Sequence, residues 1–155
     1  MSRHRVALVP LTVVAIAAAV IGADELTKRW ARHALSDHAR HVLGPLWWRL
    51  QFNSGVSFSL GASSAPWAVM VSSAVLVGVL IAAVRSAPGS ASVGWGLVLG
   101  GGLANLWDRL LSPIHEVTDF VALGRFPVFN VADSAVTVGF VVLMVLIVRG
   151  RRVFR

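Results

Sequence analysis

The stretch VGWGLVLGGGLANLWDRLL, residues 93–111, is apolar and long enough to cross a bilayer as one helix, because a span needs roughly 20 residues. It also carries an amide and two charges, Asn105, Asp108 and Arg109, whose i, i+3, i+4 spacing places them on one helical face. Polar groups at membrane depth are costly and usually face a bundle interior or a water-filled cavity. The stretch therefore predicts a helix of a membrane bundle that contributes to a polar site.

The composition of the whole chain agrees with a membrane setting. Of its 155 residues, 56% are hydrophobic and 14% are charged, whereas roughly a quarter of an average soluble protein is charged. The absence of cysteine excludes disulfides, a thiol nucleophile and thiolate metal ligands. The formal net charge is +7, but the basic residues flank apolar runs instead of gathering on a water-facing module, so we expect no nucleic-acid partner.

Three further apolar runs, at about residues 6–23, 66–84 and 132–148, join residues 93–111 to predict four transmembrane helices in a single domain, 1–155. The fold class expected is a membrane all-α bundle with both termini on one side. Each side carries seven basic residues, but those at the termini and in the short second connection are clustered, which predicts cytoplasmic termini. All seven acids then lie at or beyond the opposite, extracytoplasmic edge: Asp24, Glu25, Asp37, Asp108, Glu116, Asp119 and Asp133.

The first outer connection, between helices 1 and 2, contains LWWRLQFNSGVSFSL at residues 46–60. Apolar and polar residues alternate on both sides of an Asn-Ser-Gly turn, which predicts a small extracytoplasmic β-hairpin. Earlier in the same connection, Asp24 and Lys28 are spaced i, i+4, as an ion pair at the end of a helix would be.

The second outer connection holds two aspartates, Asp119 and Asp133, on either side of a loop that precedes the last helix. If the loop folds back, the two carboxylates meet at the membrane edge, where one stays protonated while the other acts as a base on water. Structural roles are open alternatives. Asp119 would be a solvated loop acid, and Asp133 a helix cap with Asn130 as another capping candidate.

For the polar face of residues 93–111 the structural alternatives are an interhelical hydrogen bond from Asn105 and an ion pair between Asp108 and Arg109. Such a pair would fix the helix without touching a substrate. The residues alone leave these alternatives open.

Five sequence blocks occur in an order that resembles one known family: ADELTKRW, QFNSGVSFS, GGLANLWDR, EVTDF and FNVADSAVTVG. Their order and approximate spacing are similar to those of the lipoprotein signal peptidases, from the end of the first helix into the fourth. The resemblance implies that Asp119 and Asp133 form a catalytic dyad. Positions that match the family's other polar residues are Asp24, Asn53, Asn105, Asp108, Arg109 and Asn130. Two small replacements depart from its pattern, Ser57 and Ala104, where the family usually has alanine and glycine.

The same resemblance implies an aspartic endopeptidase of the bacterial cytoplasmic membrane with its active site at the extracytoplasmic face. Its substrates would be prolipoproteins whose cysteine carries diacylglycerol, cut on the N-terminal side of that cysteine. The implied partners are these lipid-modified prolipoproteins and membrane lipid, the enzyme acting as a monomer without a cofactor. Asn105 and Asn130 would orient the dyad or the substrate, and Arg109 with Asp108 would hold the third helix. Which aspartate starts as the base is left open.

Other classes of protein are compatible with some of these features. Intramembrane Asn, Asp and Arg also line transport routes, so a small transporter or channel subunit is one alternative, although no inverted repeat is visible. A non-catalytic scaffold is another. His33, His38, His41 and His115 raise the question of metal, since His38 and His41 would meet on one helical turn. Without a HExxH motif or cysteine, we expect no metal site.

Overall fold

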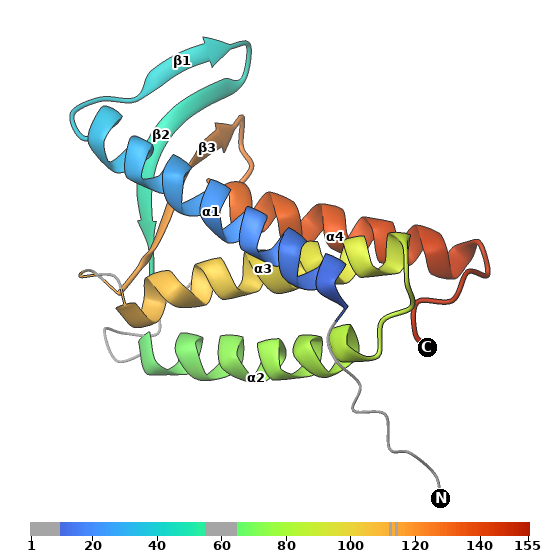
Figure 1. Ribbon diagram of the computed structural model, residues 1–155. Helices are drawn as coiled ribbons and strands as arrows, with labels where there is room; N and C mark the ends of the chain where they lie inside the picture. The colour runs from blue at the N-terminus through green and yellow to red at the C-terminus, as the bar shows by residue number, and fades with distance from the viewer. Residues whose placement is uncertain (1–9, 55–64, 112, 114) are drawn as a thin grey trace, which may run out of the picture.

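The computed structural model describes residues 10–54, 65–111, 113 and 115–155, which form four helices and a three-stranded antiparallel sheet (Figure 1). In chain order the elements are α1 (Leu11–Ala34), β1 (Arg40–Leu43), β2 (Leu46–Asn53), α2 (Ala65–Val84), α3 (Ser90–Leu111), β3 (Val117–Leu123) and α4 (Val131–Val148). Four helices are present as the sequence predicts, and a hairpin lies between the first two, although β1 and β2 form it and not the two predicted arms.

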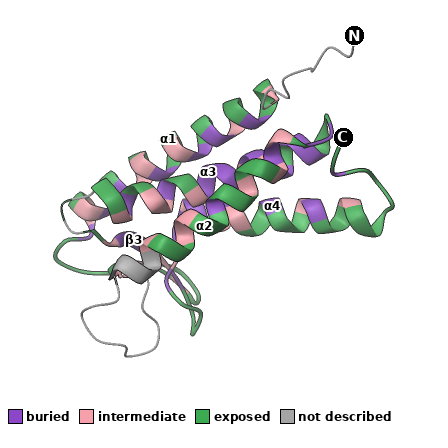
Figure 2. Ribbon diagram, turned by 90° about the horizontal axis from the view of Figure 1, so that it is seen from below, coloured by how far each residue is buried: buried purple, intermediate pink, exposed green. Residues whose placement is uncertain are grey.

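Helix α3 is the centre of the bundle and packs against α1, α2 and α4. Figure 2 shows its buried residues facing these neighbours. The approach is close because glycine has no side chain: a Cβ atom on Gly100 would lie 2.8 Å from the Cα of Ala17 in α1, and one on Gly101 would collide with the carbonyl oxygen of Ala132 in α4. The glycines therefore serve the helix packing that small residues allow in membranes.

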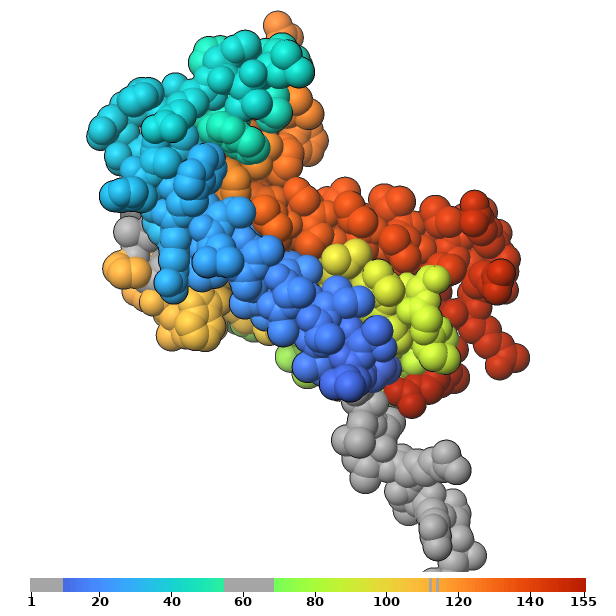
Figure 3. Space-filling view, turned by 45° about the horizontal axis from the view of Figure 1, so that its top comes forward, coloured from blue at the N-terminus to red at the C-terminus, as the bar shows by residue number. Residues whose placement is uncertain are grey.

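The sheet and the chain end lie at opposite ends of the bundle (Figures 1 and 3). The strand order is β1-β2-β3, and the sheet projects from the end of α1 where that helix runs into β1. At the other end, Arg155 pairs with the connection between α2 and α3, its backbone N–H donating to the carbonyl of Arg85 at 2.8 Å. One end of the molecule thus holds the start of α1, the connection between α2 and α3, and the end of the chain.

The first helix and the hairpin differ in detail from the prediction. Helix α1 continues to Ala34, well past residue 23, so Asp24 and Lys28 lie inside it and not at its end. The hairpin seen in the described residues joins β1 and β2 and turns at Gly44, which has a positive φ of 52° that favours glycine. Asn53 closes β2, while residues 55–64, which contain the other predicted arm and Ser57, lie outside the described residues.

A third strand was not predicted. Asp119 lies in β3, where it is paired with Gln51 of β2, and is not a solvated loop acid. The run VTDFVAL is rich in β-branched and apolar residues, which is the composition typical of a strand and would have predicted one. His38 and His41 do not share a helical turn, the arrangement that raised the question of a metal, because His41 lies in β1 and His38 precedes that strand.

Within the described ranges, α4 is the one helix that is both long and apolar enough to qualify as a membrane span by length and composition. Residues 69–84 of α2 form a shorter apolar stretch. Helix α1 carries acidic and basic residues in its second half, and α3 is interrupted by glycines and polar groups. The prediction of four spans therefore stays a prediction.

Candidate active site

Asn130 joins the two aspartates that the sequence analysis singles out. It is the N-cap of α4, and its Oδ1 accepts a hydrogen bond from the backbone N–H of Asp133 at 2.8 Å. The carboxylate of Asp133 accepts in return from the backbone N–H of Asn130 at 3.2 Å, which completes a capping box. The side-chain Nδ2 of Asn130 donates to Oδ1 of Asp119 at 2.7 Å. Asn130 is thus the helix cap that the sequence offered as a candidate. The same residue binds both carboxylates, Asp119 through its side chain and Asp133 through its backbone N–H.

Asp119 is almost completely removed from solvent, with 1% of its surface exposed. Its second oxygen, Oδ2, accepts a hydrogen bond from Nδ2 of Asn53 at the end of β2, at 3.1 Å. Burial raises the pKa of Asp119 from 3.8 to about 6, and the nearby carboxylate of Asp133 adds to the rise. Hydrogen bonds from Asn53 and Asn130 and the charge of Lys28 lower this pKa and offset only part of the effect. This carboxyl group thus holds a proton far more readily than an exposed aspartate.

Helix α3 supports both carboxylates through its polar face. Asn105 donates from Nδ2 to Oδ1 of Asp133 at 2.7 Å. Asp108, one turn further along, accepts the backbone N–H of Thr118 at 3.2 Å and so fixes β3 immediately before Asp119. One residue positions the α4 carboxylate, and the other positions the strand that carries its partner.

A buried ammonium group lies beneath this arrangement. Lys28 of α1 has no exposed surface, and its Nζ contacts Oδ2 of Asp24 at 2.6 Å, Oδ2 of Asp108 at 2.8 Å and Oδ1 of Asn105 at 3.0 Å. Asp24 also accepts the backbone N–H of Ala132 at 2.8 Å, which joins the first helix to the last. The Asp24–Lys28 pair is as predicted, but it is central and not a helix-end contact.

Sequence reasoning missed the role of Lys28 and misplaced the partner of Asp108. The ion pair of Asp108 is with Lys28, and among the described residues Asp108 and Arg109 form none with each other. On a helix, adjacent residues diverge by about 100°, since 3.6 residues complete a turn, so i and i+1 do not face each other. A lysine in an apolar helix that continues past residue 23 is the signal that would have identified Lys28.

Two cavities reach Asp133 from different sides. One, of about 430 Å³, lies between α2, α3 and α4 and is lined by Asn105, Arg109 and apolar side chains such as Leu76 and Phe140. The Nε atom of Arg109 is buried and has no hydrogen-bond partner within the described part of the chain. The other cavity, of about 510 Å³, is lined by Asn53 and by apolar residues of the β3–α4 connection and α4, among them Phe129. A ligand in either cavity would meet the carboxylate.

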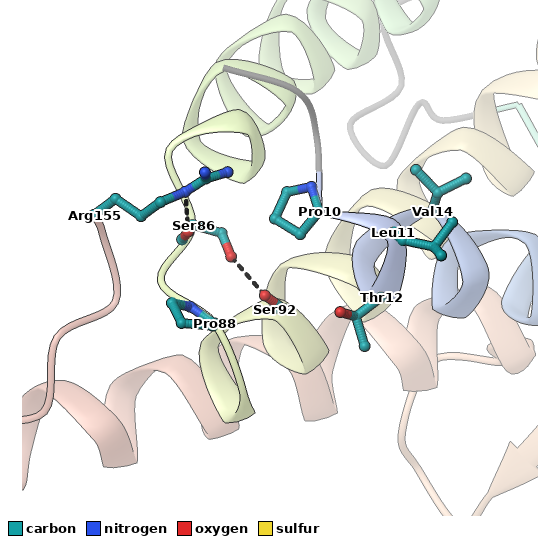
Figure 4. A pocket seen from close by; sticks show the side chains of 8 residues that line it. All are labelled: Pro10, Leu11, Thr12, Val14, Ser86, Pro88, Ser92 and Arg155. Atoms are coloured by element: carbon teal, nitrogen blue, oxygen red, sulfur yellow. Dashed lines mark hydrogen bonds between the residues drawn. The ribbon is translucent and has the colours of Figure 1, made fainter. Parts of the chain in front are cut away.

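A cavity larger than these two lies elsewhere. It measures about 800 Å³ and lies at the opposite end of the bundle, between Pro10, Pro88 and Arg155 (Figure 4). Its buried hydroxyls, on Ser86 and Ser92, are hydrogen-bonded to each other at 2.9 Å, and no carboxylate lines it. Size alone therefore does not identify the candidate site, whereas paired carboxylates do.

The arrangement around Asn130 has the components of an aspartic hydrolase. Both carboxylates accept hydrogen bonds from Asn130, Asp119 from its side-chain Nδ2 and Asp133 from its backbone N–H. The pKa of Asp119 is raised, and apolar cavities adjoin Asp133. Such a pair of carboxylates activates water without a covalent intermediate. The structure brings Asn53, Asn105, Asn130, Asp119 and Asp133 into direct contact, holds Asp24 and Asp108 behind them through Lys28, and places Arg109 at the cavity. In the described ranges no group of three or more His, Asp or Glu side chains is arranged to hold a metal ion.

Known proteins resemble this chain along most of its length. A family model described as signal peptidase (SPase) II matches residues 16–149. A lipoprotein signal peptidase of Mycobacterium leprae is 34% identical over 145 residues, covering 89% of this chain and 72% of the relative. One from Pseudomonas putida is 38% identical over 138 residues, covering 80% and 79%.

Two solved structures, both described as bacterial membrane enzymes, share the fold. One superposes with a TM-score of 0.76 at 24% identity, covering 89% of this chain and 88% of the other. The second has a TM-score of 0.77 at 25% identity and covers 88% and 92%. With a family model that matches nearly the whole described bundle, and a site built on two carboxylates, the chain is a membrane peptidase that belongs to the signal peptidase II family.

Proposed function

We propose that this protein removes the signal peptide from diacylglyceryl-modified prolipoproteins by hydrolysis between Asp119 and Asp133. The observation that carries the proposal is the convergence of both carboxylates on Asn130, with cavities on two sides of Asp133. The relatives are named for lipoprotein signal peptidase activity, which supports the substrate class. Cleavage on the N-terminal side of the lipid-modified cysteine is part of the proposal.

The proposed chemistry is a proton exchange between two carboxyl groups. The ionised aspartate takes a proton from water as the water oxygen bonds to the scissile carbonyl carbon, and the protonated aspartate gives its proton to the carbonyl oxygen. In the second step the first aspartate protonates the amide nitrogen, the second recovers a proton from a hydroxyl of the tetrahedral intermediate, and the C–N bond breaks. The pair returns to its starting state after each cycle.

Arg109 has a different role from the one that sequence reasoning gave it. Its guanidinium lines the cavity between α2, α3 and α4, and its Nε needs an acceptor. A backbone carbonyl of the substrate would supply that acceptor, because a buried donor without a partner is costly. We therefore place Arg109 among the substrate-binding groups and not among those that hold α3.

The proposed setting is the bacterial cytoplasmic membrane, with four spans, cytoplasmic termini and the site at the extracytoplasmic end. Helix α4 supports this, because it is strongly apolar after its first turn while only 22% of its residues are buried within the bundle. Exposed apolar side chains on α2 and α4, such as Val75, Val141 and Met144, would be unfavourable in water and favourable against lipid. Arginines cluster at the end that holds Arg155, as the cytoplasmic side requires.

The test is the initial rate at which purified, detergent-solubilised protein cleaves a diacylglyceryl-modified precursor. Asp119→Asn and Asp133→Asn should each abolish cleavage, because asparagine has nearly the shape of aspartate but cannot transfer the proton. Asp37→Asn is the matched control, since Asp37 is an exposed aspartate outside the candidate site, and it should keep the wild-type rate. Thermal melting verifies that each variant is folded. A folded Asp119→Asn or Asp133→Asn variant with wild-type turnover would show that the dyad is wrong.

The substrate class has its own test. The same precursor without its diacylglyceryl group should be cleaved far more slowly by the wild-type protein, because the apolar cavities beside Asp133 would then have no lipid to bind. Equal turnover of the two precursors would refute the lipid requirement and leave a general aspartic peptidase.

A further inference from the structure

Three side-chain amides donate to the dyad, from Asn53, Asn105 and Asn130, and the orientation of the last two follows from their neighbours. Asn130 must turn Oδ1 toward the backbone N–H of Asp133, so its Nδ2 faces Asp119. Asn105 receives both Lys28 Nζ and Asn130 Nδ2 at a single atom, at 3.0 and 3.1 Å. Because both are donors, that atom must be the oxygen, and the Nδ2 of Asn105 is left to face Asp133.

Lys28 and Asn130 fix this orientation together, and Lys28 is the charged one of the two donors. An ammonium has three donors and no acceptor, and here all three donors are engaged, by Asp24, Asp108 and Asn105. A flipped Asn105 would direct its NH₂ at an ammonium, which is repulsive. The positive charge also polarises the Asn105 amide, so its N–H is a stronger donor to Asp133.

The two carboxylates are consequently unequal. Asp133 is half-buried, lies in the first turn of α4 where the helix dipole favours negative charge, and accepts the amide that Lys28 orients. Asp119 lies in a strand, has no helix terminus behind it and is almost fully buried. The raised pKa of Asp119, about 6, agrees with this difference.

We propose that Lys28 is a positioning residue for the reaction: by fixing the orientation of the Asn105 amide it keeps Asp133 as the ionised carboxylate that takes the proton from water, and leaves Asp119 to carry the shared proton. This inference rests on the proposed function for its meaning in catalysis. The charged groups that face the dyad are Asp24 and Lys28 from α1, Asp108 and Arg109 from α3, and the two aspartates themselves. Helix α2 contributes no charged group, because its sequence contains no charged residue.

The experiment compares pH–rate profiles of kcat and KM for the lipid-modified precursor. Lys28→Met alone would leave Asp24 and Asp108 unpaired, which threatens folding. The double variant Lys28→Met/Asp108→Asn avoids this and leaves the net formal charge of the three side chains unchanged. Asp108→Asn alone is measured beside it, so the difference between the two variants reports the loss of the ammonium group. We expect the acidic limb of the double variant to move to higher pH by about one unit, which is a tenfold loss of ionised base at a given pH below that limb. The difference in rate from the wild-type protein should shrink as the pH rises above that limb, with kcat affected more than KM.

Two further variants separate positioning from general damage. Asn105→Ala removes the donor to Asp133 but leaves Lys28 paired with both aspartates, and it should move the acidic limb in the same direction. Arg29→Met changes the next residue of α1, whose side chain is 71% exposed and pairs with Glu25, and it should leave the profile unchanged. A folded double variant with the wild-type profile, or with a rate lowered equally at every pH, would overturn the role of Lys28.

Infrared difference spectroscopy of the protein without substrate provides a second readout. At about pH 5, the signal of a protonated carboxyl group should be lost in Asp119→Asn and kept in Asp133→Asn. In the Lys28→Met/Asp108→Asn background the two substitutions should differ less in this signal. The reverse assignment, or an unchanged difference in that background, would refute the proposal. If the wild-type protein cleaves no precursor while these infrared results hold, the proposed function fails and the proton assignment stands.

Discussion

Asp119 and Asp133 differ in how far water reaches them, and this difference sets the expected pH dependence. Because Asp119 acts in its protonated form and its pKa is raised to about 6, its active form predominates below that pH and is lost above it. We predict that kcat/KM, which reports the free enzyme, falls as the pH rises through about 6, by up to tenfold per pH unit. Apparent values belong to the coupled pair. A flat profile between about pH 5 and pH 8 would contradict this assignment.

Asp108 is a second residue whose role the geometry revises. Asp108→Asn should retain the contact to the Thr118 N–H but would remove one of the two carboxylates that neutralise Lys28. Breaking a buried pair in this way costs about 3 kcal/mol. We predict a clearly lower melting temperature together with reduced cleavage. Asp37→Asn, at an exposed position, provides the comparison, and an Asp108→Asn variant as stable as that control would show that the buried ion pair contributes nothing to stability.

At the scale of elements, the contact between α3 and α4 depends on Gly101. A methyl group there would meet the carbonyl oxygen of Ala132 and a methyl of Val136, so the helices would have to separate. Gly101→Ala should destabilise the protein by about 1–3 kcal/mol, as overpacking does. Gly78→Ala in α2 is the matched control, because nothing lies within 4 Å of a Cβ atom there, and it should be neutral or stabilising by about 1 kcal/mol. Equal melting temperatures for the two variants would mean that α3 and α4 can separate at no cost.

The elements also show how far the sequence predicts this fold. Apolar runs of about 20 residues are sufficient to locate four helices, since each is fixed by its own composition. Strand β3 depends instead on long-range pairing: Asp119 lies opposite Gln51, more than sixty residues away, and no local period reports such a register. For the same reason the two aspartates were singled out by their motifs and not by their pairing. The role of Lys28 was underestimated because Asn105 and Asp108 come from a distant helix, and because its pairing with Asp24 inside a helix depends on α1 continuing to Ala34.

At the scale of the whole molecule, the proposed membrane orientation makes a direct prediction. A reporter fused after Arg155, or inserted at Gly89, should report the cytoplasm, and one inserted near Asp37 should report the outside. Gly89 is suited to insertion because it lies in the α2–α3 connection and nothing lies within 4 Å of a Cβ atom there. Ser86 and Ser92, which are hydrogen-bonded to each other, lie on either side of it in the chain. An outside signal from the fusion after Arg155 would refute the orientation.

The hydrogen bond from the Ala132 N–H to Asp24 has a consequence for biosynthesis. Its two residues are 108 positions apart, so the hydrogen bond to Asp24 in the first helix cannot form until the start of the last helix has been synthesised. Asn105 and Asp108 join them when the third helix is made, and Asp133 comes with the fourth. A partly synthesised chain therefore lacks both the base and the cap that aligns it. The nascent chain therefore cannot hydrolyse a peptide bond until its last helix has been synthesised and inserted.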